Sequence, residues 1–209
     1  MSTSKIVFSL NETEKIVIEL HDAINRIHCC SDASIFFVQG VQQYLLEKWM
    51  LSFNIPILSS LLSQALKNKL PMHKLIMEDL GYLYAQYRFY SADRIMLGKL
   101  GFVFEKVDGQ YSWMGEKYLL WAYDMAAWLY NDTDGNIVLE LAPVYKGNRF
   151  DEEGETDFTD YDAFLKNYKP LFTRVIPRDV AQQWLDQANK ILQHIADNVE
   201  RFAKEAESK

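Results

Sequence analysis

Residues 102–114 read FVFEKVDGQYSWM, and this stretch decides the class of fold. Apolar and polar residues alternate on both sides of Asp108-Gly109, and an Asp-Gly pair between alternating runs is a strong signal for a two-residue hairpin turn. Strand-like runs continue through residues 118–130 and 137–145, separated by the turn-rich segment NDTDGN. We therefore predict an antiparallel meander of about four strands over residues 102–145.

The C-terminal segment predicts an edge strand followed by a long helix. Residues 171–176 form a short apolar run that extends the sheet at its edge, and Pro177 suits the first turn of a helix. From residue 178 to about 206, apolar residues recur at intervals of three and four, which predicts a long amphipathic helix. Its apolar stripe comprises Val180, Trp184, Leu185, Ala188, Ile191, Leu192, Ile195, Val199 and Phe202.

Residues 1–100 favour helices when their apolar positions are read at the same spacing. That spacing recurs from Ile16 to Ile27 and from Phe37 to Leu51, while Pro56 and Pro71 suit the starts of two further helices. We therefore predict an α+β protein in which an N-terminal helical bundle covers one face of the meander. We expect a single domain over residues 1–209, with 1–100 and 101–209 as the alternative subdivision, and the sequence contains no visible internal repeat.

Composition limits the classes of partner. The chain has 209 residues, 49% of them hydrophobic and 14% aromatic, which is enough for a substantial core. Its net charge of −7 argues against binding to nucleic acid or to an anionic membrane, because both depend on Lys and Arg. The same charge favours a basic protein as a partner, since opposite charge steers association over long range. We predict no cofactor.

The two cysteines, Cys29 and Cys30, are adjacent in sequence, so no disulfide framework is expected. The first residues, MSTSKIVFSLNETEK, lack the apolar core of a secretory signal. No apolar run approaches the roughly 20 residues that span a bilayer. These features together predict a cytoplasmic location.

The most unusual stretch is DEEGETDFTDYD at residues 151–162, in which seven of twelve residues are acidic and none is basic. It lacks the order of ligands that a calcium loop requires, although Asp160 suits the N-cap of a following helix. We interpret the stretch either as a solvated loop or as an acidic arm that contacts a basic partner, with aromatic anchors inside it. The candidate partner-binding residues are Asp151, Glu152, Glu153, Glu155, Asp157, Phe158, Asp160 and Tyr161.

The wealth of Tyr and Trp supports a second interpretation, in which a pocket between the sheet and the helices binds a small ligand or substrate. Aromatic rings would line it and the cationic groups would hold an anionic part of the ligand, although core packing and surface ion pairs explain the same residues. The candidates are His73, Arg88, Arg94, Trp121, Tyr123 and Trp128.

A metal ion could be held by His21, His28 and Cys29, with Glu14 seven residues before His21, because imidazole and thiolate suit zinc. On the predicted helix, adjacent cysteines diverge by about 100° and cannot easily share one ion. We therefore predict no metal site. The chain also lacks the nucleophile-elbow, phosphate-loop, zinc-protease and dinucleotide-binding motifs, so no catalytic residue is assigned.

Two functions of different classes remain. The first is a non-enzymatic interaction module, of inhibitor, immunity or adaptor type, that presents an acidic surface to a basic protein. The alternative is an enzyme or small-ligand-binding protein with an aromatic-lined pocket. The apolar stripe of the long C-terminal helix adds the expectation of a homodimer through that helix.

Overall fold

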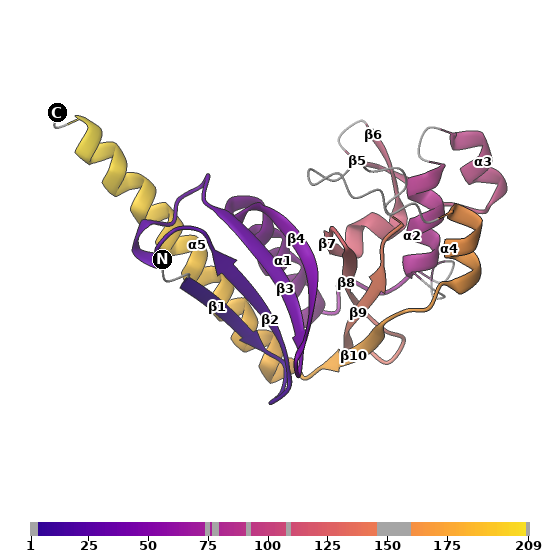
Figure 1. Ribbon diagram of the computed structural model, residues 1–209, viewed down its shortest axis with the longest axis horizontal. Coiled ribbons are helices and arrows are strands. Elements are labelled where there is room, and N and C mark those ends of the chain that lie inside the picture. The colour runs from indigo at the N-terminus through magenta and orange to yellow at the C-terminus, as the bar shows by residue number, and fades with distance from the viewer. Residues whose placement is uncertain are drawn as a thin grey trace.

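The computed structural model describes residues 4–73, 76, 80–90, 93–107, 110–145 and 160–207. It contains both helices and antiparallel sheets, which confirms the predicted α+β class at that level. Two four-stranded sheets lie in different halves of the molecule, and a long helix ends at the C-terminus (Figure 1).

The N-terminal residues form an antiparallel sheet, so the predicted N-terminal helical bundle is wrong. Strands β1 (Ser4–Ser9), β2 (Glu14–Leu20), β3 (Asp32–Gln39) and β4 (Gln42–Met50) pair in chain order. A short 3-10 helix, η1 (Ile24–Arg26), lies in the connection from β2 to β3. Ile6, Ile18 and Ile35 are opposite one another across three strands and are all buried, so one face of this sheet is apolar.

The error has a physical reason. A separation of four residues returns to the same face of a helix and also to the same face of a strand, because four is a multiple of the strand period of two. Ile16 and Leu20 fit both patterns, but the buried Ile18 between them fits only a strand. The second missed signal is Gly40, whose φ of 59° allows the tight turn between β3 and β4.

The apolar face of the first sheet is covered by two helices. Helix α1 (Leu51–Leu66) follows β4 directly and contains Pro56, so it begins earlier than the start predicted at that proline. Helix α5 (Arg178–Glu207) returns from the C-terminal half and packs against α1 (Figure 1). The Trp184 indole donates a hydrogen bond to the carbonyl oxygen of Ser9 at 2.8 Å, which fixes α5 to β1.

The middle of the chain contains two short helices and a hairpin. Helix α2 (Leu80–Phe89) is followed by α3 (Arg94–Lys99), which Asp93 caps by accepting a hydrogen bond from the backbone N–H of Met96. Strands β5 (Phe104–Val107) and β6 (Gln110–Trp113) pair antiparallel with Val107 opposite Gln110, which confirms the hairpin.

The predicted meander of about four strands is only partly right, because the run 118–130 forms two strands and β5 and β6 form a sheet of their own. After the 3-10 helix η3 (Met114–Tyr118), the second four-stranded sheet has the order β10-β9-β8-β7. Its strands are β7 (Leu119–Ala122), β8 (Met125–Asn131), β9 (Ile137–Pro143) and β10 (Phe172–Ile176). Helix α4 (Tyr161–Asn167) lies between β9 and β10 in the chain, and β10 is the predicted edge strand.

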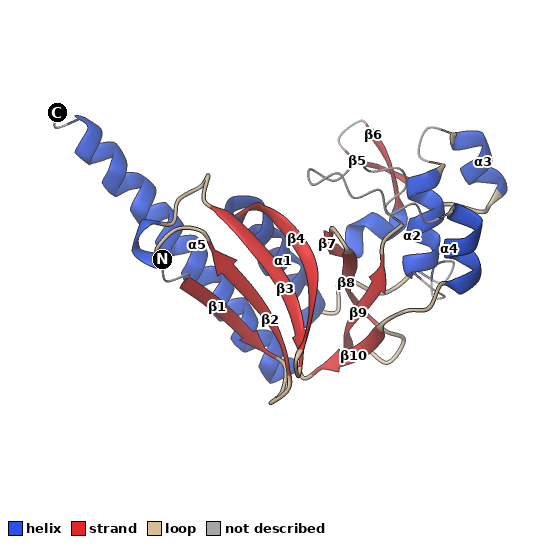
Figure 2. Cartoon of the chain, in the orientation of Figure 1, coloured by secondary structure: helices blue, strands red, loops and turns tan. Residues whose placement is uncertain are grey.

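The same order of elements occurs twice. Four strands paired in chain order are followed by a helix in β1–β4 with α1, and again in β7–β10 with α5 (Figure 2). The two copies differ at the third connection. Gly40 and Val41 alone join β3 to β4, whereas residues 144–171 join β9 to β10.

The apolar stripe of α5 packs inside its own chain. Trp184, Ala188, Ile191 and Ile195 are buried, while Val199 further along is 41% exposed. The end of α5 extends beyond the first sheet (Figure 1). The surface on which a homodimer was predicted is therefore largely covered by α1 and the first sheet, and only the C-terminal part of the stripe faces solvent.

Candidate functional site

The acidic stretch is described only from residue 160 onward. Asp151, Glu152, Glu153, Glu155, Asp157 and Phe158 lie outside the described residues. The side chain of Asp160 accepts a hydrogen bond from the backbone N–H of Ala163 at 3.0 Å, which confirms the predicted N-cap of α4. Asp160 therefore stabilises the first turn of α4.

Tyr161 is part of an aromatic cluster and is only 9% exposed. Its ring stacks on Phe89 with centroids 3.7 Å apart and planes inclined by 5°, and it lies 5.2 Å from the ring of Tyr145. Tyr90 and Phe164 complete what we call the Tyr161 cluster: Phe89, Tyr90, Tyr145, Tyr161 and Phe164. Burial raises the pKa of the Tyr161 hydroxyl to about 12.

The Tyr161 cluster joins two parts of the connection between β9 and β10. Residues 146–159 lie outside the described residues, and Tyr145 before them contacts Tyr161 after them. This contact lies beside the end of α2, where the ring of Phe89 stacks on that of Tyr161. Phe89 there is 47% exposed and is a surface residue that the sequence reasoning missed. Its position on α2, in an aromatic-rich run, did not distinguish it from core residues.

The six residues of the predicted ligand pocket do not share one environment. Trp121 and Trp128 are buried in the core, and the Trp128 ring lies 5.7 Å from that of Tyr84. Tyr123 and His73 are partly buried, and Arg88 and Arg94 are exposed on α2 and α3. A ligand at the surface would meet the cations but neither tryptophan.

Arg88 faces a carboxyl group that sequence reasoning did not single out. Glu116, in η3, is hydrogen-bonded to the side chains of Tyr87 and Ser112, and burial raises its pKa although these bonds and the charge of Arg88 oppose the rise. The same environment raises the pKa of Tyr87, mainly through burial. These groups form a polar contact between α2, β6 and η3.

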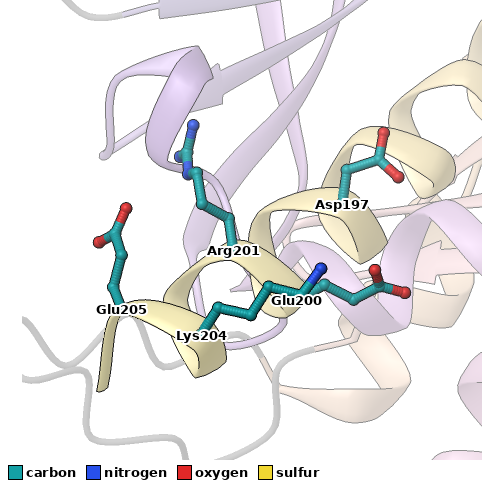
Figure 3. Close-up of a pocket in the computed structure, with 5 residues that line it drawn as sticks. All are labelled: Asp197, Glu200, Arg201, Lys204 and Glu205. Atoms are coloured by element: carbon teal, nitrogen blue, oxygen red, sulfur yellow. The ribbon is translucent and has the colours of Figure 1, made fainter. Parts of the chain in front are cut away.

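A hollow of about 400 Å³ lies near the C-terminal end of α5 (Figure 3). Its lining residues all come from that one helix and carry mixed charge: Asp197, Glu200, Arg201, Lys204 and Glu205. In the close-up their side chains spread along the outside of the helix (Figure 3). Among the described residues no second element closes the hollow, so they do not form the convergent walls of a ligand pocket.

One group of potential metal ligands is present among the described residues. A ring nitrogen of His28 and the sulfurs of Cys29 and Cys30 lie within 4.8 Å of one another. The sequence argument against a metal assumed a helix here, but residues 29–30 form a turn between β2 and β3, so both thiols can face the same side. His21, the other histidine considered, lies apart and has Ser34 as its neighbour at 3.5 Å.

No protein-family model, no curated protein and no solved structure matches this chain. Its description therefore rests on its own residues. Among the described residues, no helix combines the length and the apolar character needed to cross a membrane.

Proposed function

We propose that this chain is a non-enzymatic interaction module, of inhibitor, immunity or adaptor type, that binds a basic protein through the acidic segment between β9 and β10. One observation carries the proposal. Antiparallel neighbours such as β3 and β4 need only Gly40 and Val41 as a connection, yet residues 144–171 join β9 to β10. That connection is far longer than the roughly two to five residues usual for a hairpin loop, and it includes helix α4.

The residues in this connection support a charged partner. Seven carboxylates fall within 151–162, and the chain as a whole has a net charge of −7, so a basic protein is attracted both locally and over long range. Exposed apolar side chains lie on the neighbouring helices, with Phe89 at the end of α2 and Ile95 on α3. Charge would steer the partner and these side chains would give it apolar contact.

The test compares three versions of the full chain that are immobilised and exposed to lysate from the native organism. In the first variant Asp151, Glu152, Glu153, Glu155 and Asp157 are replaced by their amides. A matched control replaces five exposed acids elsewhere: Glu12, Asp134, Asp186, Asp197 and Glu200. Both variants change the net charge equally, so only the position of the lost charge differs.

We expect a basic protein that binds the wild type and the control but not the segment variant, and whose binding weakens as salt is raised. The replacement Phe89→Ser should weaken the same complex at every salt concentration, because its contribution is apolar. Equal retention of the partner by all three charge versions would refute the acidic segment as the binding site. Equal loss in both charge variants would assign the binding to overall charge alone.

A further inference from the structure

The connection between β2 and β3 is fixed to the C-terminal part of α5. Asn198 donates a hydrogen bond to the carbonyl oxygen of Ile27 at 2.8 Å, and both residues are buried. Arg201 donates to the carbonyl oxygen of Asn25 at 2.8 Å, and a ring nitrogen of His194 lies 3.0 Å from the carbonyl oxygen of Ile24. Three side chains of α5 thus hold the backbone of this loop in one position.

The turn that follows is shaped by its own hydrogen bonds. The backbone N–H of His28 donates to the Ser31 hydroxyl at 3.0 Å, and that hydroxyl donates to Asp22 at 2.6 Å. The backbone N–H of Cys30 donates to Nδ1 of His28 at 3.1 Å. Nδ1 is therefore the unprotonated nitrogen, and its lone pair points towards the turn that carries both thiols.

The separation of the two sulfurs suits one tetrahedral ion. Sγ of Cys29 and Sγ of Cys30 are 3.6 Å apart. Two thiolates bound to one zinc ion at about 2.3 Å each, at the tetrahedral angle, lie roughly 3.8 Å apart. A disulfide requires a distance of about 2.05 Å between the two sulfurs and usually a Cα–Cα distance above about 4.4 Å. The trans peptide between adjacent residues holds their Cα atoms about 3.8 Å apart. The arrangement therefore favours chelation over a bond between the two cysteines.

Access and charge are also suitable. Both cysteines are exposed, so an ion can reach them without a change of fold. His28 is partly buried and its ring packs edge-on against Phe202 of α5, with centroids 6.3 Å apart, which limits the orientations of the imidazole. Asp32, the first residue of β3, is close enough for its negative charge to act on Cys30. A cation is favoured in this field.

We propose that Nδ1 of His28 and the sulfurs of Cys29 and Cys30 bind one soft divalent cation of the zinc class, with a fourth position left open to solvent. Two thiolates and one imidazole form a donor set that selects such ions over magnesium or calcium. Binding replaces the hydrogen bond from the Cys30 N–H to Nδ1 and releases two thiol protons to solvent for each ion bound. The site lies on a different part of the chain from the acidic segment and does not depend on the function proposed for it.

The test uses the reduced full-length protein and Co²⁺ as a spectroscopic probe, followed by displacement with Zn²⁺. We expect one ion per chain, a thiolate-to-cobalt charge-transfer band, and the intense visible bands of four-coordinate cobalt. Each of Cys29→Ser, Cys30→Ser and His28→Gln should lower the affinity by at least about tenfold. The matched control His73→Gln should leave it unchanged.

Two further measurements distinguish a metal site that the fold holds in place from non-specific binding by two neighbouring thiols. Asn198→Ala releases Ile27 from α5 without touching a ligand, and it should weaken binding while circular dichroism shows the fold intact. Saturating Zn²⁺ should also slow alkylation of both cysteines in the wild type, a readout that needs no variant. The proposal is overturned if His28→Gln binds as tightly as the wild type, if less than one ion binds per chain, or if Zn²⁺ leaves the alkylation rate unchanged.

Discussion

Replacing Arg174 by glutamine should destabilise the fold more than replacing Glu14 by glutamine, although both changes break the same ion pair. Glu14 lies on β2 and Arg174 on β10, so the pair joins the two four-stranded sheets. The arginine contacts the carboxylate through Nε at 3.0 and 3.1 Å and through a terminal nitrogen at 2.9 Å. Asn11 and Gln39 donate further bonds to the same carboxylate.

The two partners differ in burial, and this difference sets the magnitudes. The side chain of Glu14 is 7% exposed and that of Arg174 is 37% exposed. Arg174→Gln leaves a buried carboxylate without its cation and also removes the guanidinium from the face of Phe172, 4.8 Å away. We expect the free energy of unfolding to fall by about 3 kcal/mol, the lower end of the range for a broken buried ion pair. The lower end applies because Asn11 and Gln39 still donate hydrogen bonds to the Glu14 carboxylate. Glu14→Gln leaves an arginine that water can reach and should cost about 2 kcal/mol.

Urea denaturation at pH 7 measures the loss in free energy of unfolding for each single variant, and the double variant completes a double-mutant cycle. The double replacement should cost less than the sum of the single ones, because each single variant already breaks the pair. A smaller loss for Arg174→Gln than for Glu14→Gln would refute the reasoning from burial. Purely additive losses would show that the two side chains do not interact in solution.

The pair should also give a defined pH dependence. Hydrogen bonds from Arg174, more than any other cause, lower the pKa of Glu14 below its ordinary value of 4.5. A carboxyl group with a lowered folded-state pKa contributes stability above its unfolded pKa and loses it as pH falls through the folded value. The stabilities of the wild type and Glu14→Gln should therefore converge below about pH 4.5. A gap that stays constant from pH 7 to pH 3 would contradict this assignment.

Two further predictions concern a close contact and a buried hydroxyl. Gly81→Ala should destabilise the protein by about 1–3 kcal/mol, because the new Cβ would lie 2.3 Å from Cβ of Ala142. Gly98→Ala would place its new Cβ with no atom within 4 Å, so it should be neutral or should stabilise the protein by up to about 1 kcal/mol. Thermal unfolding of the two variants gives the comparison, and equal effects would contradict it. Tyr130 donates a hydrogen bond to Glu140 at 2.9 Å, and burial strongly raises its pKa. Stability should therefore fall as pH rises above about 10, where only the unfolded chain ionises this group, and Tyr130→Phe should reduce that slope in urea titrations at pH 9 and 11.

The C-terminal half could be predicted because its signals are local. An Asp-Gly pair between alternating runs defined the β5–β6 hairpin, Asp160 capped α4, and Pro177 marked the start of α5. Each of these features depends on a few neighbouring residues and on backbone chemistry that needs no tertiary contact. The edge strand predicted at residues 171–176 is also present as β10, which lies at the edge of its sheet next to β9.

The N-terminal half could not be predicted from spacing alone. The pair Ile16 and Leu20 fits two periods, and only the burial of Ile18 decides between them. The same error removed the possible metal ligands from consideration, since Cys29 and Cys30 diverge on a helix but not in the turn that the structure contains. Sequence reasoning found the residues and misjudged the backbone that presents them.

The repeated order of elements shows how short the connection between the third and fourth strands of such a sheet can be. Both sheets bury an apolar face, and Gly40 with Val41 shows how little chain is needed between their third and fourth strands. In the second copy the connection spans 144–171, and Tyr145 and Tyr161 within it are in ring contact. Tyr161 also stacks on Phe89, which is 47% exposed, so the described end of the acidic stretch begins beside an apolar surface residue. Under the proposed function, a basic partner bound there would be steered by the carboxylates and would make apolar contact with Phe89.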